Sequence, residues 1–415
     1  MFAMCGLLIG CGAKTGLYYD DGGGPDIRDA GMDTPDVPPD VPIPCFEVPR
    51  EAGPVDIAFV LPVALRVADV FFLIDATASM EDEIDTIRER LRSDVVPGVR
   101  ARIPEAQFGV ALVGEFPVSG FGPPEVSPYD MRQQVTDELI SVEAALERFP
   151  TWGNFDEPEA QVEGLFQVAT GAGLLPWIEP SSGCPRGGRG GACFRRDALP
   201  VVLLITDAPM NNGPRGIRPQ TDYDFVGANR GPHTFQEAVD AANDLGIFVI
   251  GLGARDALSA SPMPHLRAMA QATGAIANGE LLAIDIGGDG AGVGEGIVNA
   301  IARLAEGTLL DVDAVIEDVP GDEFDARTLV ESIAPLEATP SSGVREITAD
   351  SFLGVVPGTS VTFRVQVDAA SVPLRAETLR IPARVLFRAF GRSRLDRREI
   401  LLVVPGEDGG SCDTP

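Results

Sequence analysis

Residues 69–83 read Asp-Val-Phe-Phe-Leu-Ile-Asp-Ala-Thr-Ala-Ser-Met-Glu-Asp-Glu. The large apolar residues at 70–74 predict a strand that is buried on both faces, which is typical of a parallel sheet. Three oxygen-bearing side chains follow the strand at alternate positions, and helix-forming sequence begins at Met80. They belong to Asp75, Thr77 and Ser79. Because open α/β sheets bind ligands at the carboxyl ends of their strands, we expect a binding site here.

The chemistry of these side chains favours a hard cation. One carboxylate and two hydroxyls suit Mg²⁺, Mn²⁺ or Ca²⁺ better than zinc. The segment 75–79 resembles the Asp-x-Ser/Thr-x-Ser signature of the metal-ion-dependent adhesion site in von Willebrand factor type A (vWA) domains. The resemblance covers roughly residues 65–306. It implies a site for Mg²⁺ or Mn²⁺ whose open coordination position takes an acidic side chain of a protein ligand.

Strand-like and helix-like segments alternate from residue 68 to residue 307, which predicts a doubly wound, mostly parallel α/β domain flanked by helices. Buried strands are expected at 107–113, 199–206 and 247–252, with an edge strand at 281–284. Helices are expected at 139–146, 160–169, 234–245, 263–272 and 293–306. We interpret residues 285–290 as a turn and residues 116–132 as a loop.

A second group of candidate ligands lies in residues 153–159, directly before an expected helix. This loop resembles the corresponding metal loop of integrin β subunits, which implies that Glu159 reaches the central cation. The same resemblance implies an adjacent site, suited to Ca²⁺, built from Asn154, Asp156, the Pro158 carbonyl and Glu159. The alternative is structural, because a proline and acidic residues at a helix start also complement the helix dipole.

Two further acidic segments match the same families. Asp207 ends the expected strand 199–206, and in vWA domains an aspartate at this position contributes to the metal site, usually through water; such residues also cap turns. Asp82 and Glu83 match two acidic residues of a regulatory cation site in integrin β subunits, although Glu83 replaces an aspartate. An acidic first turn of a helix is the alternative for this pair.

The composition restricts the partners of the protein. The 415 residues contain 62 acidic and 32 basic side chains, for a net charge of −30. Such a charge repels phosphate backbones and anionic bilayers, so we expect no nucleic-acid partner. The chain has two histidines, His233 and His265, which leaves few candidates for histidine-dependent catalysis.

The first 44 residues indicate export and anchoring. Residues 7–11, Leu-Leu-Ile-Gly-Cys, fit the lipobox of a bacterial lipoprotein within a signal at 1–11, so Cys11 is the expected lipidation site and the only membrane contact. Residues 12–44 are rich in Gly, Asp and Pro and predict a disordered acidic tether. Gly12 follows the cysteine, as in lipoproteins of the outer membrane. An incidental cysteine in an apolar terminus is the alternative.

Four cysteines remain after Cys5 and Cys11, and an even number in an exported chain suggests disulfides. Three pairings are open. Locality favours Cys184 with Cys193, which flank a glycine-rich loop, and Cys45 with Cys412, which bracket the folded region. Free thiols in a reducing compartment are the alternative.

The sequence beyond residue 307 predicts a second domain. Short alternating segments at 309–316, 360–367, 384–390 and 400–404 indicate a β-sandwich over residues 308–405. The entry segment 45–67 contains a stretch that fits a further strand of this domain, and residues 406–415 form a flexible tail.

These features favour a surface-anchored adhesion or ligand-capture protein of the bacterial envelope, periplasmic or exposed outside. Two alternatives stay open. A metal-assisted hydrolase would use cation-activated water, but the sequence has no P-loop, G-x-S-x-G elbow or H-E-x-x-H motif. A structural scaffold of an envelope complex would use the same domains without the metal. We therefore expect a protein that is not an enzyme.

Overall fold

The computed structural model describes residues 43–147, 150–155, 157–185, 187–254, 260–288, 290–321 and 323–413. The expected lipidation residue Cys11, the tether up to residue 42 and the candidate ligand Asp156 lie outside the described residues. Residues Ile43–Pro415 form one compact unit, which contains both folded domains. Within the described residues, no helix has the length and apolar character needed to cross a membrane.

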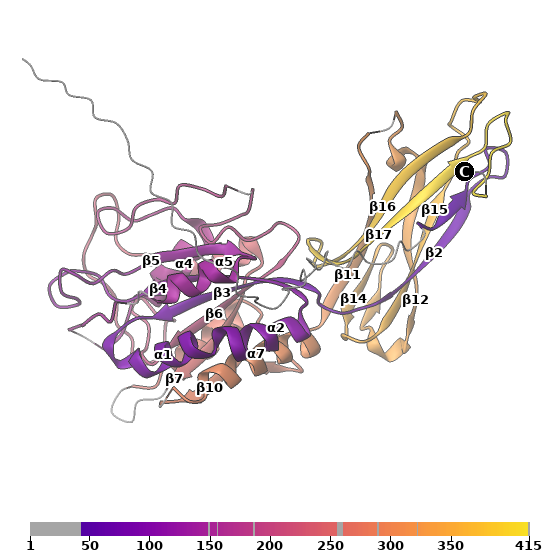
Figure 1. Ribbon diagram of the computed structural model, residues 1–415. Coiled ribbons are helices and arrows are strands. Elements are labelled where there is room, and N and C mark those ends of the chain that lie inside the picture. Colours follow the sequence, from indigo (N-terminus) through magenta and orange to yellow (C-terminus); the bar gives the residue numbers. More distant parts are fainter. Residues whose placement is uncertain are drawn as a thin grey trace, which may run out of the picture. The chain divides into compact units, whose positions relative to one another are not determined.

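The α/β domain is built on a six-stranded sheet (Figure 1). Its strands, in spatial order, are β10 (Ala283–Gly287), β7 (Phe248–Ala254), β6 (Leu199–Thr206), β3 (Val67–Asp75), β4 (Glu105–Val113) and β5 (Asp130–Thr136). All neighbours run parallel except β4 and β5. Every residue of β3 is buried, as expected of a central parallel strand covered on both faces.

Helices cover both faces of this sheet. One face packs against α1 (Glu81–Arg90), α2 (Val96–Arg102), α3 (Leu139–Leu146) and α7 (Val293–Gly307). The other packs against α4 (Gln161–Thr170), α5 (Phe235–Leu245) and α6 (Met263–Ala272). Alternate residues of β3 divide between the two cores: Phe72 joins the first and Phe71 the second. Figure 1 shows α1, α2 and α7 on one side of the sheet and α4 and α5 on the other.

Two expectations for the edges of the sheet were wrong. The expected edge strand at 281–284 lies later, because β10 pairs with β7 from Ala283 onward and continues past a bulge at Asp285, where we expected a turn. At the other edge, β5 begins inside the expected loop 116–132. Its residues are polar and half-buried, so neither an apolar run nor a clear alternation marks it.

The second domain is a sandwich of two sheets around one apolar core. The larger sheet has the order β1 (Cys45–Glu47), β17 (Ser393–Val404), β16 (Leu379–Ala389), β11 (Leu310–Asp318), β14 (Ser351–Val355) and β13 (Glu346–Ile347). The smaller has β12 (Val330–Thr339), β15 (Ser360–Val367) and β2 (Val55–Pro62). Since β1 and β2 precede the α/β domain, that domain is inserted between β2 and β11. The predicted fold class is confirmed.

Both favoured disulfide pairings are confirmed. Cys45 is bonded to Cys412, with 5.8 Å between their Cα atoms, and joins the two ends of the sandwich domain. Cys184 is bonded to Cys193, with 5.3 Å between their Cα atoms, and closes the glycine-rich loop of the α/β domain.

Candidate metal site at the carboxyl edge of the α/β sheet

Asp75 is the last residue of β3, and its side chain is completely buried between β4 and β6. Its Oδ1 accepts hydrogen bonds from the Thr77 backbone N–H at 3.0 Å and from the Thr77 hydroxyl at 2.7 Å. An aspartate that binds the N–H two residues ahead stabilises a tight turn. The local sequence therefore bends the chain so that Asp75 and Thr77 lie side by side.

The third residue of the signature joins this turn. The hydroxyl oxygens of Ser79 and Thr77 lie 3.2 Å apart, and Ser79 is exposed whereas Thr77 is buried. A short 3-10 turn, Ala78–Met80, precedes α1 and carries Ser79. The structure thus brings Asp75, Thr77 and Ser79 together, with Ser79 on the solvent side.

Backbone hydrogen bonds connect the loop 152–159 to the signature loop on one side. The Trp152 N–H donates to the Ala76 carbonyl at 2.9 Å, and the Ala78 N–H donates to the Trp152 carbonyl at 3.0 Å. These bonds place the start of the loop 152–159 against the turn that holds Thr77.

The same loop is also tied to the segment after β6. The Glu159 N–H donates to the Pro209 carbonyl at 3.0 Å, and the Asn211 N–H donates to the Glu159 carbonyl at 2.9 Å. The three loops that carry the candidate ligands therefore form one hydrogen-bonded layer at the carboxyl edge of the sheet.

The carboxylates of this layer influence one another. Glu159 is completely buried, and its Oε1 accepts a hydrogen bond from the Asn154 side chain. Asp207 is only 5% exposed. Burial, followed by the negative charge of Asp207, raises the pKa of Asp75 to about 7. A cation between Asp75 and Asp207 would relieve this repulsion.

The donor set fits a hard cation only if hydroxyls take part. Within the described ranges, no three Asp, Glu, His or Cys side chains gather closely enough to hold a metal by themselves. Asp75 and Asp207 supply carboxylate oxygens, and Thr77 and Ser79 add neutral oxygens. Oxygen-only sets of this kind suit Mg²⁺ and Mn²⁺. The residues present therefore fit such an ion better than zinc.

The residues expected at the adjacent sites are only partly grouped. Asn154 contacts Glu159, and the Pro158 carbonyl accepts a hydrogen bond from the Asn211 side chain at 2.9 Å. Asp82 is exposed, whereas Glu83 is 2% exposed. Burial raises the pKa of Glu83, and the Gly290 N–H donates to it.

Glu115 was not among the site residues predicted from the sequence. It follows β4 by two residues and is completely buried. Its Oε2 accepts a hydrogen bond from the Asn211 side chain, and its Oε1 from the Tyr223 hydroxyl, each at 2.7 Å. Asn211 also holds the loop of Glu159, so Glu115 belongs to the same network. The available signal was a carboxylate after a buried strand, as at Asp75.

An aromatic cluster lies beside Glu115. Ring centroids of neighbouring members are 4.9–5.3 Å apart, mostly in edge-to-face geometry. The members are Phe116, Phe121, Trp177, Tyr223 and Phe225. Burial and the adjacent Glu115 charge raise the pKa of Tyr223. The cluster fixes the loops that surround the candidate site.

Both histidines have structural positions. His265 is 1% exposed, and its Nδ1 accepts the Met210 N–H at 3.0 Å. His233 is 3% exposed, and its Nδ1 lies 2.9 Å from a carboxylate oxygen of Glu163. Neither ring is open to solvent in the way that a general base for a surface substrate needs.

No protein-family model and no curated protein matches this chain. Several solved structures are similar to it. A von Willebrand factor type A protein from Catenulispora acidiphila is 15% identical, over 87% of this chain and 72% of that chain, with a TM-score of 0.35. The pilus adhesin SpaC from Lactobacillus rhamnosus GG, in its open conformation, is 13% identical, over 86% and 45%, with a TM-score of 0.36.

Proximal thread matrix protein 1 from the mussel byssus is 11% identical, over 60% of this chain and 48% of that chain, with a TM-score of 0.32. The chain therefore spans less than half the length of the adhesin and of the byssus protein. Because the sequence identities and TM-scores are low, the fold class rests on the strand order and the two cores described above.

Proposed function

We propose that this protein is a surface-anchored adhesion or ligand-capture protein whose α/β domain is of the vWA type. Its site would bind a protein ligand through a divalent cation, Mg²⁺ or Mn²⁺. An acidic side chain of the ligand would occupy the open coordination position of that cation. One observation carries the proposal: the turn that holds Asp75, Thr77 and Ser79 lies in one hydrogen-bonded layer with the loops of Glu159 and Asp207.

Each residue of this layer has a separate role in the proposal. Asp75 supplies the buried negative charge, and Thr77 and Ser79 supply neutral oxygens, so a bound ion would keep its affinity for a ligand carboxylate. Asp207 would contribute to the cation through a bound water. Glu159 would reach the cation from the loop 152–159. Neutral hydroxyl ligands neutralise less of the charge of a cation than carboxylates do.

A second cation, Ca²⁺, is proposed next to this site. Asn154, Asp156, the Pro158 carbonyl and Glu159 would hold it, and Glu115 lies in the same hydrogen-bond network. Asp82 and Glu83 are proposed for a third position on the other side of the signature loop. The buried Glu83 is the stronger of these two candidates, because its carboxylate already accepts the Gly290 N–H.

The proposed location is the outer membrane of a bacterial envelope, with lipidation at Cys11 as the anchor. The two disulfides support an oxidising compartment, because such bonds persist mainly in exported proteins. A non-enzymatic role is supported by the buried positions of His233 and His265. Replacing Cys11 by serine should release the protein from membranes, and unchanged membrane association would contradict the anchor.

Calorimetry on the full chain tests the metal site. We expect Mg²⁺ and Mn²⁺ to bind the native protein and not the Asp75→Ala variant. The matched control is Asp244→Ala, which removes an exposed carboxylate from α5 and should leave binding unchanged. If the native chain binds none of Mg²⁺, Mn²⁺ and Ca²⁺, the metal-bridged mechanism is wrong and a structural scaffold is the better interpretation.

Tryptophan fluorescence offers an independent test, because the chain has two tryptophans, at 152 and 177. Trp152 shares two backbone hydrogen bonds with the signature loop, whereas Trp177 belongs to the aromatic cluster. In a Trp177→Phe variant, Mg²⁺ should change the emission of Trp152. A protein ligand with acidic surface loops should bind only when the same signal shows that the cation is bound.

A further inference from the structure

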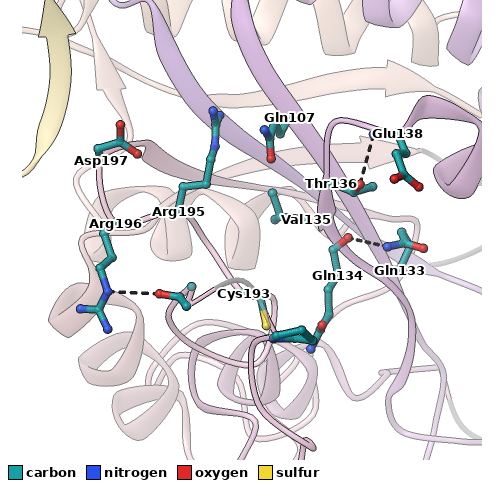
Figure 2. A pocket seen from close by; sticks show the side chains of 13 residues that line it. Gln107, Gln133, Gln134, Val135, Thr136, Glu138, Cys193, Arg195, Arg196 and Asp197 are labelled. Atoms are coloured by element: carbon teal, nitrogen blue, oxygen red, sulfur yellow. Dashed lines mark hydrogen bonds between the residues drawn. The ribbon is translucent and has the colours of Figure 1, made fainter. Parts of the chain in front are cut away.

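The α/β domain has a hollow at the amino edge of its sheet (Figure 2). Its volume is about 650 Å³, within the range of roughly 300–1,000 Å³ that is usual for small-ligand sites. Gln107, near the start of β4, and Thr136, at the end of antiparallel β5, line it. Val113, at the other end of β4, pairs with Asp75, so about 20 Å of strand separates the hollow from the candidate metal site.

The described parts of the disulfide loop, residues 184–185 and 187–193, form a preorganised wall of this hollow. The Cys184–Cys193 bond closes the loop, and the Val135 N–H donates to the Ala192 carbonyl at 3.0 Å. The Arg196 Nε donates to the Gly187 carbonyl at 3.1 Å, a bond drawn in Figure 2. These contacts fix the wall before any ligand arrives, which reduces the entropic cost of binding.

Among the described residues, the lining of the hollow is polar and its charges balance. Two arginines, Arg195 and Arg196, balance two acids, Glu138 and Asp197. No aromatic residue lines the hollow among the described residues. This composition disfavours phosphorylated or sulfated ligands, which need an excess of cationic groups, and it disfavours apolar ligands, which need an apolar lining.

Three glutamines line the hollow, and their amides retain bonding capacity. The Gln107 amide makes no hydrogen bond within the described residues. Gln133 and Gln134 use their Nε2 groups to bind backbone carbonyls, which leaves their Oε1 atoms as acceptors. Amides and hydroxyls both donate and accept, as sugar hydroxyls do.

We propose that this hollow binds a neutral oligosaccharide, recognised by the amides of Gln107, Gln133 and Gln134 and by the hydroxyl of Thr136. An added peptide strand is the competing occupant for a groove beside an edge strand. It fits less well, because the outward Val135 N–H is already bonded to the disulfide loop. The ligand is therefore recognised by side chains and not by strand pairing.

The test uses the full chain with EDTA present, so that the proposed metal site has no part in the result. The probes are neutral glucose, galactose and N-acetylglucosamine oligosaccharides of three to six units, titrated by calorimetry and ligand-observed NMR. We expect one series to bind. Gln107→Leu should weaken the affinity for that series by about tenfold or more. The leucine cannot form a hydrogen bond, so it leaves a sugar hydroxyl without a partner.

Three variants make the result decisive. Gln107→Ala repeats the test without added apolar bulk, and thermal unfolding checks that both Gln107 variants are folded. Gln271→Leu, at an exposed glutamine of α6, and Asp75→Ala should leave oligosaccharide binding unchanged. The proposal is overturned if no neutral series binds, if folded Gln107 variants bind normally, or if sulfated oligosaccharides or extended peptides bind more tightly.

Discussion

The Thr206 hydroxyl donates a hydrogen bond to Oδ2 of Asp75 across 2.6 Å, joining the ends of two adjacent parallel strands. The Gln161 side chain in turn donates to the Thr206 hydroxyl at 2.9 Å. Because Thr77 binds the other carboxylate oxygen, both oxygens of Asp75 are oriented by neighbouring hydroxyls. The carboxylate is thus fixed from the sheet side before any cation binds.

Replacing Thr206 by valine keeps the side-chain shape and removes this donor. A hydrogen bond to a charged group contributes about 1.5–3 kcal/mol, so we expect Mg²⁺ affinity to fall about tenfold or more. Calorimetry on the folded variant measures the change. Thr170→Val is the matched control, because that hydroxyl is exposed at the end of α4 and bonds to the Phe166 carbonyl and the Ala172 N–H, far from Asp75 in the chain. Equal affinities of the Thr206 variant and the native chain would contradict the orienting role.

A buried ion pair at the opposite edge of the sheet controls stability. Burial raises the pKa of Asp69, and Arg195 opposes the shift: its guanidinium Nε donates to Oδ1 at 2.7 Å, and its backbone N–H donates to Oδ2 at 2.6 Å. Arg195→Met should cost about 3–5 kcal/mol of unfolding free energy, because it leaves a buried charge unpaired. Urea unfolding measures this loss.

The double variant Asp69→Asn with Arg195→Met should recover most of that stability, since no buried charge remains. Arg303→Met is the control, because Arg303 and Glu280 form an exposed pair that is expected to contribute less than about 1 kcal/mol. If the two arginine variants lose equal stability, the buried charge is not the cause.

The two disulfides should differ in their effect. Chain entropy predicts about 5–6 kcal/mol for the Cys45–Cys412 bond, which spans a separation of 367 residues, and about 2.5 kcal/mol for Cys184–Cys193, which spans 9. Paired serine variants of each bond, compared by denaturant unfolding, test the order. A larger loss from the short loop would show that loop entropy does not dominate.

The hydrogen bonds at the start of α5 predict that the stability of the folded protein depends on pH. Burial opposes the shift, but the Thr234 N–H, Arg230 and the Thr234 hydroxyl together lower the pKa of Glu237 to about 2. A lowered folded-state pKa contributes stability above the unfolded value of 4.5, and this contribution is lost as the pH falls toward 2.

The free energy of unfolding of the native chain should therefore exceed that of Glu237→Gln by about 0.5–1 kcal/mol at pH 6. The excess is small because 41% of the Glu237 side chain is exposed. It should shrink between pH 5 and pH 3 in urea titrations. A constant excess over this range would mean that the helix cap does not depend on the carboxylate charge.

Local sequence was enough to predict most elements. The expected helices 139–146, 234–245 and 263–272 lie within one residue of α3, α5 and α6, because apolar periodicity and capping residues are properties of neighbouring positions. Strand β5 was missed because its pairing with β4, and not its own composition, makes it a strand.

The sequence by itself determined the turn at Asp75, because Thr77 and Ser79 follow Asp75 at alternate positions of the same short loop. It favoured the disulfide pairs that the structure shows but left the other pairings open. The tertiary structure decided the remainder of the site. Thr206 reaches Asp75, and Glu115 reaches Asn211, across separations of 131 and 96 residues. Contacts at such separations depend on the register of packed strands, which side-chain packing sets and no local pattern encodes.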